Sequence, residues 1–162
     1  MRRAPKHDAV KVRVIAVGKL REAYVARAVD DFARRLARYD PFALVEVAAS
    51  SGADPERAMR EEGERIVRAI DPAEPMWLLE RTGTQLASVE LAERLRDVAG
   101  TGTARLTIAI AGTYGASPAL RERATFAWSL SRLTFLHEWA RAIVLEQLYR
   151  AAKIARNEPY HH

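Results

Sequence analysis

The sequence predicts an α/β protein whose mostly parallel sheet is covered by helices on both faces. Apolar, β-branched runs alternate along the chain with segments of helical spacing, the order expected of repeated β–α units. Two of the helical segments begin with proline after a capping residue, at Asp54-Pro55 and Ser117-Pro118. With 162 residues and 49% hydrophobic residues, the chain is long enough for one such domain and too short for two.

The expected strands are short runs of apolar and β-branched residues. The first, KVRVIAV, ends at Gly18, and the run at residues 104–111 is the most apolar of the chain. We expect further turns at Gly83, Gly100 and Gly102. The five expected strands are Lys11–Val17, Phe42–Val47 and residues 76–79, 104–111 and 129–135.

The expected helices fill the segments between these strands. Residues 20–39 carry apolar side chains at helical spacing and end at Asp40-Pro41, and Ser88 is the expected cap of the third helix. The five expected helices cover residues 20–39, 55–70, 88–98, 118–128 and 138–156. The last helix has a broad apolar surface, which fits either a deeply buried helix or one that also packs against a second subunit.

The composition favours a polyanionic partner and argues against a membrane protein, a secreted protein and thiolate chemistry. Lys and Arg number 26 against 21 Asp and Glu, and the sequence pI near 9.9 suits a polyanionic partner, although ordinary solvated faces would also explain it. No apolar run approaches the roughly 20 residues of a membrane span, and residues 1–10 lack the apolar core of a secretory signal. We therefore expect a cytoplasmic protein with a disordered basic extension at residues 1–10 and a single domain at residues 11–162. The absence of cysteine excludes disulfides and thiolate chemistry.

Three loops at the carboxyl ends of expected strands are candidate ligand contacts: residues 80–84, 112–117 and 136–137. The glycine turn that starts at Gly112 could present backbone N–H groups to an anionic or adenine-bearing ligand, or could be only a tight turn. His137 in the third loop could equally be an ordinary loop imidazole. The four histidines show no metal-ligand spacing, so no metal site is predicted.

The order of several motifs resembles the RlmH family of SPOUT-class methyltransferases, which act on N3 of a pseudouridine in 23S ribosomal RNA. The resemblance covers residue 11 to the end and is strongest in the last third of the chain. The motifs are VIAVGK (14–19), LLERTGTQLAS (78–88), the glycine turn 111–115 with Ser117-Pro118, SLSRLTF (129–135), His137, Arg141, LEQLYRA (145–151) and EPYH (158–161).

The resemblance implies a fold that periodicity alone does not predict. Members of this family have a C-terminal trefoil knot, and two subunits form a homodimer through the C-terminal helix. They bind S-adenosylmethionine within the knot. The matching donor-binding positions here are Leu79, Gly112, Ser131, Arg132, Leu133, Thr134, Phe135 and Leu136.

The resemblance also implies an active role for the end of the chain. Tyr160 and His161 match a terminal segment that lies beside the methyl donor and the partner subunit. A neutral imidazole accepts protons near pH 7, so His161 is the expected base or a group that orients the target, and Tyr160 is expected to stack on the target base or hydrogen-bond to it. The expected contacts to phosphates of 23S rRNA in the ribosome are Arg141, Arg150 and Arg156.

Some residues depart from the family pattern around the expected donor site. Ala111 stands where a second glycine is usual, and Leu136 where proline is common. Glu80 stands where Asp is common in the family, and His162 stands where a basic residue often follows the terminal Tyr-His. These changes leave open a knotted RNA-binding or ribosome-binding protein with lost or retargeted transfer. An unrelated nucleotide-binding α/β domain is a third alternative.

Overall fold

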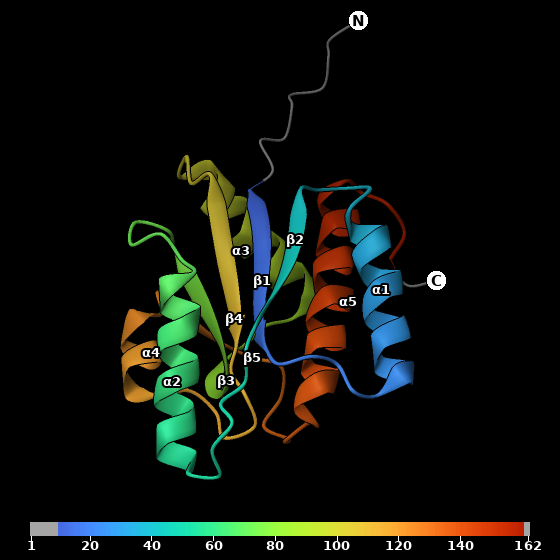
Figure 1. Cartoon of the computed structure of the whole chain (residues 1–162). Helices are drawn as coiled ribbons and strands as arrows, with labels where there is room; N and C mark the ends of the chain where they lie inside the picture. The colour runs from blue at the N-terminus through green and yellow to red at the C-terminus, as the bar shows by residue number, and fades with distance from the viewer. Residues whose placement is uncertain (1–9, 161–162) are drawn as a thin grey trace, which may run out of the picture.

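The computed structural model describes residues 10–160 and contains one five-stranded sheet in the order β2-β1-β4-β3-β5 (Figure 1). Every pairing between neighbouring strands is parallel, as the sequence predicts. The strands are β1 (Lys11–Val17), β2 (Phe42–Val47), β3 (Met76–Gln85), β4 (Arg105–Ile110) and β5 (Phe126–Ser129). The helices are α1 (Ala23–Leu36), α2 (Pro55–Arg68), α3 (Ser88–Gly100), α4 (Pro118–Arg123) and α5 (His137–Ala155).

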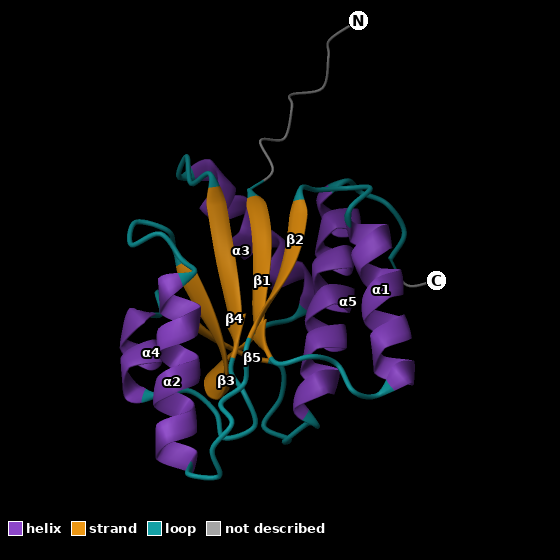
Figure 2. Ribbon diagram, viewed as in Figure 1, coloured by secondary structure: helices purple, strands orange, loops and turns teal. Residues whose placement is uncertain are grey.

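Helices cover both faces of the sheet, which confirms the predicted fold class (Figure 2). Alternate residues of β1 belong to different cores: Val14 packs with α1, α3 and α5, and Ile15 packs with α2 and α4. Both side chains are fully buried, as expected of a strand covered on both faces. The trefoil knot that the resemblance implies stays a prediction. Within residues 10–160, no helix is long and apolar enough to span a membrane.

Two predicted boundaries near the site are wrong. The predicted helix 118–128 ends at Arg123, and the last strand is Phe126–Ser129 rather than residues 129–135. Trp77 explains the shift, since its ring lies 5.2 Å from that of Phe126 and 6.5 Å from that of Trp128. Aromatic side chains favour strand positions on a sheet, where they pack against neighbouring strands, over another helical turn. Residues 130–135 are consequently loop.

The third strand is longer than predicted and is interrupted by a bulge. Both Leu79 and Thr84 align with Trp128, so the residues between them are looped out of the ladder. Gly83, predicted as a turn, lies inside β3, where an added Cβ would overlap the backbone carbonyl of Ala127. The bulge carries Glu80 away from the sheet toward the site described below.

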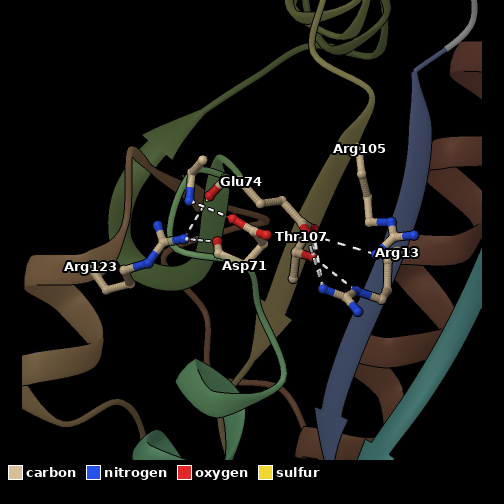
Figure 3. Close-up of polar contacts among 7 residues, drawn as sticks. Arg13, Asp71, Glu74, Arg105, Thr107 and Arg123 are labelled. Atoms are coloured by element: carbon tan, nitrogen blue, oxygen red, sulfur yellow. Dashed lines mark hydrogen bonds and ion pairs between the residues drawn. The ribbon is translucent and has the colours of Figure 1, made fainter.

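A buried ionic network fixes the opposite end of the sheet (Figure 3). Arg13 on β1 donates to Thr107 on β4 at 3.1 Å and to the carboxylate of Glu74 at 3.2 Å, and Thr107 also donates to Glu74. Arg123, at the end of α4, donates to the backbone carbonyls of Asp71 and Glu74. These contacts hold the segment before β3 against β1 and β4. Val10, predicted in the extension, is buried in the core, whereas residues 1–9 lie outside the described part.

Candidate functional site

A cavity of about 370 Å³ lies where β3, β4 and β5 end. Its wall combines the bulge of β3, the glycine turn after β4, the loop after β5 and the first residues of α5. The parallel-sheet argument selects the first two of these segments from sequence; of the third loop that it selects, residues 136–137, only His137 lines this cavity. We call this space the first cavity. Of the predicted donor-binding residues, Leu79, Gly112, Ser131, Leu133, Thr134 and Phe135 line it, whereas Arg132 and Leu136 do not.

The glycine turn is both a tight turn and a cavity wall. The N–H of Gly115 donates to the carbonyl of Gly112 at 3.0 Å, and the φ of +86° at Gly115 lies in the region that favours glycine. Gly112 lies close to α2, and an added Cβ there would overlap the carboxylate of Glu62, which would have to move. The turn is thus a tight turn that also lines the first cavity, and its contact with a ligand stays a prediction.

Helix α2 supports this turn through Glu62 and Gly63, which the sequence analysis missed. One carboxylate oxygen of Glu62 accepts the backbone N–H of Ser50 at 2.9 Å. The other oxygen has no hydrogen bond within residues 10–160 and lies against Gly112. An added Cβ on Gly63 would come within 2.6 Å of Oγ of Ser117, which caps α4. A glycine inside a helix costs about 1 kcal/mol relative to alanine, so its presence in α2 was a usable signal of close packing.

The loop after β5 is anchored by a buried serine. Oγ of Ser129 lies 2.9 Å from the carbonyl of Arg81 in the β3 bulge and 3.0 Å from that of Ser131. Oγ of Ser131 accepts the N–H of Leu133 at 3.1 Å. These bonds position the backbone of the loop at the first cavity, while the side chain of Leu133 is 70% exposed.

A larger second cavity of about 880 Å³ adjoins the first. It lies between the β1–α1 loop, the end of β2 and the start of α5, and it shares Gly112, Thr113 and His137 with the first cavity. Lys19 and Arg21 lie on its wall. Leu136, a predicted donor contact, lines this second cavity instead.

Two buried charged residues of α5 fix the β1–α1 loop. The carboxylate of Glu138 accepts the backbone N–H groups of Arg21 at 2.5 Å and Glu22 at 3.3 Å. The guanidinium of Arg141 donates to Glu46 at 2.9 Å and to the carbonyls at the end of β1 at 3.1 and 3.2 Å. The loop is thus held through its backbone, which leaves the side chains of Lys19 and Arg21 toward solvent.

The structure argues against the predicted phosphate contact of Arg141. Its side chain is 2% exposed, and its two terminal nitrogens donate to protein oxygens, so RNA cannot reach it in this conformation. Arg150 donates to Glu146 and to the carbonyl of Tyr160, and Arg156 donates to Asp40, which raises the pKa of Arg156. Both keep about one third of their side chains exposed.

The last described residues run back along α1 and α5. The hydroxyl of Tyr39 donates to Glu158 at 2.8 Å; this bond, with partial desolvation, raises the pKa of Tyr39. Arg150 binds the carbonyl of Tyr160 at 2.7 Å. Along α5, Arg150 lies about 20 Å from His137 at 1.5 Å per residue, so Tyr160 is remote from the first cavity of its own chain. His161 lies outside the described residues.

Comparisons with known proteins agree with one another. A family model described as a predicted SPOUT methyltransferase matches residues 10–161. Proteins named ribosomal RNA large subunit methyltransferase H are 38% identical in Desulfitobacterium hafniense and 44% identical in Gloeobacter violaceus, and each match covers 94% of this chain and 99% of the relative. A crystal structure of a methylase family protein from Neisseria gonorrhoeae aligns with a TM-score of 0.54 at 13% identity, over 100% of this chain and 90% of that one, and shows a shared fold.

Proposed function

Because this chain belongs to the SPOUT methyltransferase family, together with the relatives named ribosomal RNA large subunit methyltransferase H, we propose that it methylates N3 of a pseudouridine in 23S ribosomal RNA. The methyl donor is S-adenosylmethionine, and the substrate is the assembled ribosome in the cytoplasm. The observation that carries the proposal is the first cavity, which the predicted donor-binding loops line at the carboxyl ends of three strands.

The residues of the first cavity fit this donor. Its volume lies within the range of about 300–1,000 Å³ typical of small-molecule sites. Glycine at 112 leaves room for the carboxylate of Glu62 behind the turn, and the turn itself lines the cavity. Leu79, Leu133 and Phe135 supply apolar wall, and Ser131 and Thr134 supply polar groups. When bound, S-adenosylmethionine supplies an electrophilic methyl group on its sulfonium.

The protein's task is then to position the target ring and to remove one proton. N3 of the base forms a bond to the methyl carbon as the carbon–sulfur bond breaks, and the N3 proton passes to a base. We assign that base to His161 and assign Tyr160 to stacking on the target or hydrogen bonding with it. Holding N3 in line with the methyl group supplies most of the acceleration.

Tyr160 and His161 act at the first cavity of a partner subunit in this proposal. The tail of one chain is held about 20 Å along α5 from His137, so it cannot serve its own cavity without leaving Arg150. A homodimer through α5 would bring the tail of one subunit to the cavity of the other. Exposed aromatic side chains in the first turns of α1 and α5 support such an interface. Tyr24 is 47% exposed and Trp139 is 39% exposed, and their rings lie 5.7 Å apart.

The test is transfer of a labelled methyl group from S-adenosylmethionine to ribosomes whose target pseudouridine is unmethylated, followed by mass mapping of the RNA. We expect label at N3 of that base. His161→Ala should abolish transfer and leave donor binding intact. A folded protein that binds ribosomes and transfers no label would instead support an RNA-binding or ribosome-binding protein.

A further inference from the structure

We propose that the second cavity receives the target nucleotide and that Lys19 and Arg21 bind its phosphates. This inference rests on the proposed function and adds the substrate site that the donor cavity lacks. It replaces Arg141, the predicted phosphate contact that the structure buries.

The position of the second cavity is the first argument. Methyl transfer requires the acceptor nitrogen and the methyl carbon to approach within about 3–3.5 Å. The acceptor must therefore enter a space that shares a wall with the donor cavity. The second cavity shares Gly112, Thr113 and His137 with the first, and its volume of about 880 Å³ is more than twice as large.

The charges on its wall are the second argument. Four carboxylates contribute to this wall, but most are already engaged: Glu46 pairs with Arg141, Glu138 accepts two backbone N–H groups, and Glu62 bonds Ser50 behind the glycine turn. The fourth, Glu22, is exposed beside Lys19 and Arg21, which are exposed too. Within residues 10–160, neither of these cations has an ion-pair partner. Two such cations on the wall of a nucleotide-sized cavity suit a phosphodiester.

Their placement is the third argument. Lys19 and Arg21 project from a loop whose backbone is fixed by Glu138 and, through the end of β1, by Arg141. The two cations are thus held at the edge of the cavity, and their side-chain N–H groups remain available to a ligand. Arg150 and Arg156 differ in this respect, because their donors already bind Glu146 and Asp40.

The test compares Lys19→Glu and Arg21→Glu with Lys11→Glu. Lys11 is exposed at the opposite end of β1 and has no ion-pair partner in the described part of the chain, so its reversal makes the same charge change away from both cavities. We would measure donor binding by calorimetry, and methyl transfer to unmethylated ribosomes at saturating donor over a range of salt concentrations. A fourth variant, Ala49→Phe, places a ring in the second cavity from a position that does not line the first.

We expect each reversal at 19 or 21 to raise the KM for ribosomes at least tenfold, with donor affinity unchanged and with Lys11→Glu within twofold of wild type. The salt dependence of log KM should flatten by about 0.7–0.9 for each phosphate that the variant no longer neutralises. Arg21→Lys should retain most of the activity, and Ala49→Phe should bind donor and lose transfer. The inference would be overturned if Lys19→Glu and Arg21→Glu had the same KM for ribosomes as Lys11→Glu, or if Ala49→Phe transferred methyl groups at the wild-type rate. A wild-type protein that transfers no label would count against the proposed function instead.

Discussion

Arg141 is the residue for which sequence and structure give opposite expectations, so its replacement is the most informative perturbation. The sequence assigns it to RNA phosphates, whereas the structure places its guanidinium against Glu46 and the last carbonyls of β1. Arg141→Met keeps most of the side-chain volume and removes every donor. The expected consequence is lost stability rather than weaker ribosome binding.

The magnitude follows from burial. Removing one partner of a fully buried ion pair costs about 3–5 kcal/mol, because the remaining groups lose their donors. The side chain of Glu46 is 43% exposed, so water recovers part of that cost. We therefore expect a loss of about 2–3 kcal/mol, which for a chain of this length lowers the melting temperature by roughly 4–12 °C.

The assay is thermal denaturation of Arg141→Met beside Arg68→Met. Arg68 forms an exposed pair with Glu64, with side chains 78% and 55% exposed, so its removal should leave the melting temperature unchanged. The burial argument would be refuted if Arg141→Met had the melting temperature of wild type but bound ribosomes tenfold more weakly. Arg141 would then be a phosphate contact, as the sequence predicts.

Three further predictions concern the donor turn and the tail. Gly112→Ala should weaken S-adenosylmethionine binding at least tenfold in calorimetry, whereas Gly100→Ala, where an added Cβ meets no atom within 4 Å, should not. Arg150→Met should release the tail and lower kcat without changing donor affinity; equal kcat would exclude a role for the bond between Arg150 and the tail. Because Glu158 raises the pKa of Tyr39, the bond between them is fully present below about pH 10 and is lost as pH rises through the folded pKa. An absorbance titration from which the titration of Tyr39→Phe is subtracted reports the pKa of Tyr39. That pKa should be lower in Glu158→Gln than in wild type, and an unchanged pKa would exclude the bond.

The sheet was largely predictable because its strands carry their own signal. β1 and β2 begin and end where the sequence places them, since apolar β-branched runs bounded by turns leave little alternative. The region from α4 to β5 was not predictable in this way. Its local pattern permits a longer helix, and partners distant in sequence favour the strand Phe126–Ser129: the ring of Trp77, the guanidinium of Arg94 and the backbone of β3.

The candidate site was predictable in its loops and less so in its supports. Loops after parallel strands converge by topology, so Glu80, Gly112 and His137 reach one cavity as expected, and Leu79 and Thr134, which the family resemblance indicates, line it too. Burial of Glu62 and Glu138 depends on how α2 and α5 pack, which no local pattern encodes. Arg141 was misassigned for the same reason: an arginine on a helix resembles a surface cation until packing places it inside.

The supports share one design that bears on catalysis. Glu62, Glu138 and Arg141 are all buried, and all three bind backbone groups of loops that form the two cavities. A charged side chain that bonds main-chain atoms fixes the path of a loop, while the side chains of that loop remain available to ligands. Methyl transfer loses rate steeply when donor and acceptor are misplaced by about 1 Å. Ordering the loops before binding would reduce the entropy lost when donor and nucleotide meet, so we expect these helix residues to influence turnover by fixing the loops, whether or not they contact a substrate themselves.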